Sequence, residues 1–127
     1  MKVLLDTHTL LWWLAEDETL STKARQVIAS PKTIVYVSAA SAWEIAIKKA
    51  VGKLQAPDDL VAALAANRFQ HLPVTIEHAL YAGSLPRHHD DPFDRMLVAQ
   101  ALMEKLTIIT RDKSIPVINL YRHTILP

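Results

Sequence analysis

The sequence predicts an α/β protein with a largely parallel sheet that helices cover on both faces. Short apolar segments of strand length alternate with longer segments in which apolar residues recur every three or four positions. Half of the 127 residues are hydrophobic, which is enough for a substantial core in one domain, residues 1–127. Alternating strands and helices imply βαβ units, and in such folds sites form beyond the carboxyl ends of the strands.

The predicted strands are short, apolar and partly β-branched. The first leads directly into Asp6, and a later one ends just before Arg111 and Asp112. The third is weaker than the others because it is short and contains a proline. Their ranges are 2–5, 33–37, 71–74, 107–110 and 117–120.

The predicted helices have recognisable start and stop signals. Thr7 or Thr9 begins a helix through Leu14, and Ser21 caps a short helix that Pro31 ends. Ser38 caps a helix over 39–51, which Gly52 closes. Two further helices begin at 57–59, with Leu60, Val61 and Leu64 directed inward, and at Thr75. In the last helix, over 92–105, Asp91 is the N-cap and Pro92 occupies the first turn.

The composition excludes several classes of protein. Cysteine is absent, so there is no disulfide framework or thiolate zinc site, and a cytoplasmic location is expected. The apolar N-terminus is interrupted by Asp6 and His8 and is not a signal peptide. No uninterrupted apolar segment is long enough to cross a membrane. A formal net charge of +1 favours no particular polyanionic partner.

Acidic residues from separate segments are predicted to meet at one edge of the sheet. Asp6 and Asp112 follow strands, while Glu44, Asp91 and Asp94 lie near the starts of helices. A second-turn helical side chain such as that of Glu44 leans back toward its helix N-terminus. Carboxylates at this density repel one another, and hard oxygen ligands without cysteine favour Mg²⁺ or Mn²⁺ as the counter-ion.

Each of these acids also has a structural interpretation. Asp6 and Asp91 are suitable helix N-caps, and Asp94 suits the same helix end as Asp91. Glu44 and Lys48 are four residues apart and would form a solvated pair worth about 0.3–0.5 kcal/mol. Asp112 suits a tight turn. The joint placement favours the shared metal site.

Four segments in this order resemble the motifs of PIN-domain proteins, especially the VapC-type ribonuclease toxins of bacterial toxin–antitoxin pairs. They are LLDTHTLLW from Leu4, SAASAWEIAIK from Ser38, DPFDRMLVAQA from Asp91 and TRD from Thr110. The resemblance spans nearly the whole chain. It implies a three-layer α/β/α sandwich with a central, mostly parallel sheet and an acidic pocket that binds Mg²⁺ or Mn²⁺.

The resemblance also implies an activity and the residues that perform it. The activity is metal-dependent hydrolysis of RNA phosphodiester bonds, with 3′-hydroxyl and 5′-phosphate products. The four acids of the family correspond to Asp6, Glu44, Asp94 and Asp112, with Asp91 and Thr110 as helpers. We expect Asp6 and Asp94 to be direct ligands. The implied partners are a cognate antitoxin that lies over the active-site groove and a second copy of the chain.

Basic and aromatic residues are candidates for contact with RNA. Arginines beside the acids and Lys48 would supply positive charge at the rim of the pocket. They are Arg87, Arg95, Arg111 and Lys48. Trp13 and Trp43 suggest base stacking, but their helical spacing favours a place in the core or in an interface. For Trp12, both base stacking and a place in the core or in an interface stay open as interpretations.

Two other functions compete with the nuclease. A phosphohydrolase that forms an aspartyl-phosphate at Asp6 would need a second Asp two residues later, where this chain has His8. The other alternative is a non-catalytic RNA- or protein-binding module whose acids only cap helices. Asp6→Asn and Asp94→Asn distinguish these alternatives from the nuclease.

Overall fold

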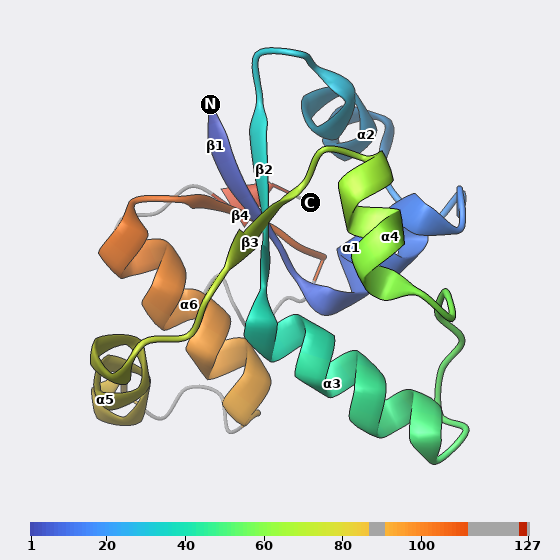
Figure 1. Cartoon of the computed structure of the whole chain (residues 1–127). Coiled ribbons are helices and arrows are strands. Elements are labelled where there is room, and N and C mark those ends of the chain that lie inside the picture. Colours follow the sequence, from blue (N-terminus) through green and yellow to red (C-terminus); the bar gives the residue numbers. More distant parts are fainter. Residues whose placement is uncertain (87–90, 112–124, 127) are drawn as a thin grey trace.

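The computed structural model describes residues 1–86, 91–111 and 125–126 and shows a parallel sheet between layers of helices (Figure 1). Five strands are arranged in the order β3-β2-β1-β4-β5, and every neighbouring pair is parallel. The strands are β1 Lys2–Leu5, β2 Ile34–Ser38, β3 Gln70–Leu72, β4 Thr107–Ile109 and β5 Ile125–Leu126. The predicted fold class, an α/β sandwich with a parallel sheet, is confirmed.

Six helices connect the strands and cover the sheet. Their ranges are α1 Thr7–Leu14, α2 Thr22–Ala29, α3 Ala39–Ala50, α4 Leu60–Ala66, α5 Ile76–Ser84 and α6 Pro92–Glu104. In Figure 1, α5 and α6 lie on one side of the sheet, and α1, α2 and α4 lie on the other. The predicted caps Ser21, Ser38, Thr75 and Asp91 are confirmed, since each side chain accepts a hydrogen bond from the first turn of its helix.

Two hydrophobic cores lie on opposite faces of the sheet because successive strand residues point to opposite sides. Val3 and Leu5 of β1 contribute to one core, which they share with α1, α2 and α4. Leu4, between them, contributes to the other core together with α5 and α6. All three side chains are fully buried, so β1 is covered on both faces. This coverage explains why the strand before Asp6 is continuously apolar.

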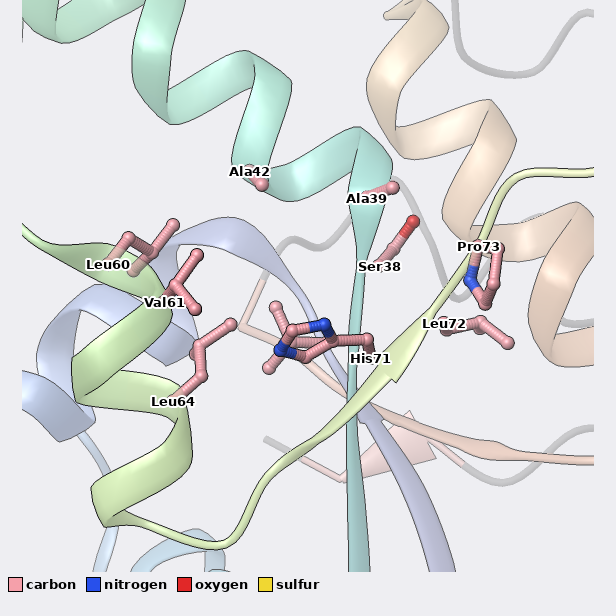
Figure 2. A pocket seen from close by; sticks show the side chains of 10 residues that line it. Ser38, Ala39, Ala42, Leu60, Val61, Leu64, His71, Leu72 and Pro73 are labelled. Carbon is pink, nitrogen blue, oxygen red and sulfur yellow. The ribbon is translucent and has the colours of Figure 1, made fainter.

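One expectation about the elements is wrong, and another lies outside the described residues. Val61 is not directed inward, because 65% of its surface is exposed, whereas Leu64 on the same helix is buried. Val61 lines an open cleft between α4 and β3, visible in Figure 2, instead of packing in the core. The strand predicted at 117–120 lies outside the described residues, and a strand that the sequence did not suggest, β5, pairs with β4.

Among the described residues, no helix is both long enough and apolar enough to span a membrane.

Candidate active site

The topology of the sheet brings the ends of β1 and β4 together. From β1 the chain continues to β2 and β3 on one side, whereas β4 lies on the other side of β1. In open parallel sheets, ligands bind beyond the carboxyl ends of the strands at such a switch point. Asp6 directly follows β1 and Thr110 directly follows β4, so both lie at this position. The sequence prediction of a site beside Asp6 agrees with this topology.

Asp6 is buried and is held by two hydrogen-bond donors. Only 5% of the residue is exposed. One carboxylate oxygen accepts a 2.8 Å hydrogen bond from the backbone N–H of Thr9, which makes Asp6 the N-cap of α1. The other accepts a hydrogen bond from the Thr110 hydroxyl. Burial raises the pKa of this carboxyl, and these hydrogen bonds offset only part of that effect. Asp6 therefore combines its structural capping role with a costly buried charge.

Glu44 is the second buried acid, and it is connected to the turn that follows Asp6. It is 4% exposed and projects from the second turn of α3. The Thr7 hydroxyl donates a 2.6 Å hydrogen bond to Glu44 Oε1 and also lies 3.1 Å from the Ser41 hydroxyl. Thr7 thus joins the start of α1 to α3 and keeps Asp6 and Glu44 at the same edge of the sheet. Sequence reasoning missed this role of Thr7 and Ser41, although both lie within three residues of a predicted acid.

Lys48 is a cation inside the acidic site. Its Nζ lies 2.5 Å from Glu44 Oε2. This hydrogen bond raises the pKa of Lys48, and the charges of Glu44, Asp91 and Asp94 raise it further. The expected Glu44–Lys48 pair does form, but it is not a solvated surface pair, because Glu44 is buried.

Asp91 and Asp94 occupy the first turn of α6. One Asp91 carboxylate oxygen accepts hydrogen bonds from the N–H groups of Phe93, at 2.8 Å, and Asp94, at 3.3 Å. Asp91 is thus the predicted N-cap, with Pro92 in the first turn. Asp94 is partly buried. Asp6, Glu44, Asp91 and Asp94 are called the acidic site below.

The basic residues predicted to contact RNA have different surroundings. The Arg95 guanidinium donates hydrogen bonds to the carbonyl oxygens of Ala82 and Leu85, both at 2.8 Å, and of Pro86 at 3.2 Å. Arg95 therefore ties α6 to the end of α5. Arg111 donates a 2.6 Å hydrogen bond to the Thr19 carbonyl. Arg87 and Asp112 lie outside the described residues. The predicted RNA contacts of the four basic residues stay predictions.

The donor atoms suit a hard divalent cation. Buried carboxylate oxygens are the ligands that Mg²⁺ and Mn²⁺ prefer, and an adjacent cation would compensate the burial that raises the pKa of Asp6. In the described part of the chain, however, no three acidic or histidine side chains stand close enough together to hold an ion. One carboxylate oxygen of Glu44, Oε2, already forms an ion pair with Lys48. The donor chemistry therefore fits the ion, and Asp112, the fourth predicted ligand, lies outside the described residues.

The tryptophans divide between core and surface. Trp13 packs against the core, and its indole N–H donates a 3.0 Å hydrogen bond to Asn67 Oδ1, in agreement with the prediction. Trp43 is not in the core, because 65% of its surface is exposed. It meets the ring of Phe93 edge to face, with centroids 5.6 Å apart and planes at 70°. Trp12 is partly buried against the same core as Trp13, and its ring centroid lies 5.9 Å from that of His8.

A second cleft lies away from the acids, between α3, α4 and β3. Figure 2 shows Leu60, Val61 and Leu64 of α4 facing His71 across it. Its volume is about 300 Å³, and Ser38 and His71 supply its polar side chains. None of the lining residues is an acid, so the chemistry predicted for the acidic site has no counterpart in this cleft.

Comparison with known proteins identifies the family. Residues 3–119 match the model of the PIN domain, so the chain belongs to the PIN-domain family. The chain is 31% identical over 114 residues to "Ribonuclease VapC22" of Mycobacterium tuberculosis, with 87% of each chain covered. The family match and the similarity to a VapC protein agree with the VapC-type resemblance that the sequence motifs predicted.

Solved structures of the same fold include a chain from a toxin–antitoxin complex of Klebsiella pneumoniae, with a TM-score of 0.59 and 18% identity, covering 87% of this chain and 86% of that one. A VapBC2 complex of Rickettsia felis bound to a promoter DNA fragment contains a chain with a TM-score of 0.70 and 15% identity, covering 100% of this chain and 98% of that one. FitAcB of Neisseria gonorrhoeae gives a TM-score of 0.60 and 18% identity, covering 100% and 97%. At these identities, the similarity establishes the fold.

Proposed function

We propose that this chain is the toxin of a type II toxin–antitoxin pair and a Mg²⁺- or Mn²⁺-dependent endoribonuclease of the cytoplasm. The observation that carries the proposal is the buried Asp6 at the switch point of the sheet, with Glu44 joined to the same edge through Thr7. Membership of the PIN-domain family and similarity to a protein named as a ribonuclease support it.

The residues of the acidic site have distinct roles in this proposal. Asp6, Asp94, Glu44 and Asp112 would hold the ion. When bound, the ion would supply an activated water and would neutralise charge on the phosphodiester. Thr110 and the N–H of Thr9 fix both oxygens of Asp6, so this carboxylate is preorganised. Thr7 fixes one oxygen of Glu44, which leaves Glu44 positioned to orient the attacking water.

Partner proteins are part of the proposal. The structural neighbours are chains from complexes such as the VapBC2 and FitAcB assemblies, which supports a cognate antitoxin for this chain. We propose that the antitoxin covers the acidic site and that the toxin forms a homodimer. Large exposed apolar side chains, such as Ile76 at 76% and Leu80 at 71%, are compatible with protein contacts.

The decisive experiment tests the purified chain, free of any partner, against a panel of structured RNAs. We expect Mg²⁺ or Mn²⁺ to support cleavage and EDTA to abolish it. Asp6→Asn and Asp94→Asn should each reduce the cleavage rate by at least a hundredfold and remove growth inhibition, because each removes a charged ligand. Circular dichroism and binding to the antitoxin should be unchanged.

Asp58→Asn is the matched control. It makes the same chemical change at a fully exposed carboxylate whose partner is Lys49, so cleavage should stay at the wild-type rate. Undiminished toxicity of Asp6→Asn would contradict the proposed mechanism. Absence of metal-dependent cleavage of any RNA would favour the non-catalytic binding module.

The contacts of Asp6 bear on the phosphohydrolase alternative. One Asp6 oxygen accepts a hydrogen bond from Thr9 N and the other from Thr110, and each oxygen keeps a second lone pair, so these contacts suit a metal ligand and a nucleophile equally. His8, two residues after Asp6 where an aspartyl-phosphate enzyme would need a second Asp, favours the ligand role. Trapping of a phosphorylated Asp6 after incubation with a phosphate monoester would reverse this preference.

A further inference from the structure

An apolar groove lies directly beside the acidic site. It has a volume of about 460 Å³ and lies between the first turns of α3 and α6 and the segment after β3. Trp43 and Phe93 form its aromatic side. The remaining lining is aliphatic and includes Ala39, Ala40, Val74 and Met96.

The aromatic residues of the groove are direct sequence neighbours of two of the acids. Trp43 immediately precedes Glu44, and Phe93 immediately precedes Asp94. Successive helical residues point about 100° apart. Therefore α3 buries Glu44 while it leaves Trp43 65% exposed in the groove. The groove therefore adjoins the helical turns that carry Glu44 and Asp94.

We propose that this groove is a nucleobase subsite, in which a base flanking the scissile phosphodiester stacks on Trp43. The inference rests on the proposed function, because the acidic site must hold the phosphodiester. A base is joined to its phosphate through a single sugar, so it must lie next to the acids. Ala39 and Ala40 leave space for a flat ring beside the indole, and Phe93 holds the indole edge to face.

The charges nearby suit a nucleotide better than a wholly apolar segment of protein. Lys48 lies five residues after Trp43, about 140° around the helix, and does not line the groove; about a third of its side chain, 34%, is exposed. A nucleotide offers both an apolar base for the groove and a phosphate for the charged residues of the same helix. The polar acids on its border would be costly to cover with an apolar side chain.

The first test measures cleavage kinetics on a short single-stranded RNA that spans a cut site. Trp43→Ala should raise KM by roughly five- to a hundredfold, as expected for loss of one stacked base, and should change kcat less than threefold. Trp43→Phe should recover most of the loss. An abasic nucleotide at one position beside the cut should weaken the wild type but have no further effect on Trp43→Ala.

Val61→Ala is the control, since Val61 is an equally exposed apolar residue, at 65%, on a different helix. It should leave both constants unchanged. Equal KM values for Trp43→Ala and the wild type would overturn the inference. So would equal wild-type cleavage of the abasic and intact oligonucleotides, or a Trp43→Ala variant that loses only antitoxin binding.

A second test separates this inference from the proposed nuclease activity. A ten-nucleotide single-stranded RNA is added in EDTA to Asp6→Asn, and tryptophan fluorescence is measured. Stacking should quench the emission, and the quench should disappear in Asp6→Asn/Trp43→Phe. No quench by RNA of any base composition would overturn the subsite even if the wild type cleaves RNA. A Trp43-dependent quench without cleavage by the wild type would support the subsite and contradict the nuclease.

Discussion

The charged form of Asp6 makes the folded protein less stable. Its pKa is raised by burial, so the folded chain binds the Asp6 proton more tightly than the unfolded chain does. Stability therefore falls as pH rises above the unfolded pKa of about 3.9, until the folded pKa is passed.

We predict that Asp6→Asn stabilises the metal-free protein at pH 7 by about 1 kcal/mol, or roughly 3–6 °C in Tm. Asparagine is also a good N-cap, and its amide can keep both the Thr9 and the Thr110 contacts. Thermal unfolding in EDTA at several pH values measures the effect. The difference from the wild type should vanish below pH 4, and a destabilised variant at pH 7 would contradict the prediction.

We expect Lys48 to compete with the proposed metal ion for Glu44. Its ammonium lies 2.5 Å from Oε2, and the charges of Asp91 and Asp94 also act on it. We predict that Lys48→Met binds Mn²⁺ about three- to tenfold more tightly, because a partly exposed cation in the site repels the ion by about 1 kcal/mol. Calorimetric titration measures the affinity. Unchanged or weaker binding would show that Lys48 helps to position Glu44 for the ion.

At the scale of elements, the start of α6 depends on a capping carboxylate. Asp91 accepts hydrogen bonds from Phe93 N and Asp94 N. We predict that Asp91→Ala lowers the free energy of unfolding by about 0.5–2 kcal/mol and that Asp91→Asn, which can still cap, lowers it much less. Urea denaturation measures both.

The same pair of variants tests the helper role of Asp91. If Asp91 only caps the helix, Asp91→Asn should cleave RNA at the wild-type rate. A large loss of cleavage by Asp91→Asn at unchanged stability would instead establish a role for its charge in the acidic site.

The helices α3 and α6 also determine how exposed the aromatic residues are. Trp43 follows the helical spacing of a core residue, yet it faces the groove because α3 turns its Glu44 side toward Thr7 and the sheet. Arg95, predicted as an RNA contact, ties α6 to the carbonyl oxygens that end α5. In both cases the packing of two helices decides the position of a side chain that local spacing leaves ambiguous.

At the scale of the whole molecule, metal binding and folding should be coupled. The acidic site takes residues from the end of β1, from α3 and from the start of α6, so it exists only in the folded chain. We predict that Mn²⁺ at a hundred times its dissociation constant stabilises the protein by about 2.7 kcal/mol, or roughly 10 °C in Tm. Thermal unfolding with and without the ion measures this shift.

Asp6→Asn should abolish most of this stabilisation, whereas Asp58→Asn should retain it. Equal stabilisation of Asp6→Asn and the wild type would place the ion elsewhere on the protein.

Much of the architecture was predictable from the sequence because it depends on local patterns. The apolar segment before Asp6 has the length and composition of a strand covered on both faces, and the structure contains it as β1, Lys2–Leu5. Ser21, Ser38, Thr75 and Asp91 are good caps wherever a helix follows, and each caps one. The order of the motifs also sufficed to predict the PIN-domain family.

Tertiary structure alone decided how these side chains meet. The Thr7 and Thr110 contacts join residues 37 and 104 positions apart, and no local periodicity encodes such pairings. Likewise, the exposure of Trp43 and Val61 depends on which neighbouring elements leave a groove or a cleft open. The sequence by itself determined which segments form strands and helices, because backbone propensity and periodicity are local. The folded chain determined the surroundings of each acid, because burial and charge depend on residues that are distant in sequence.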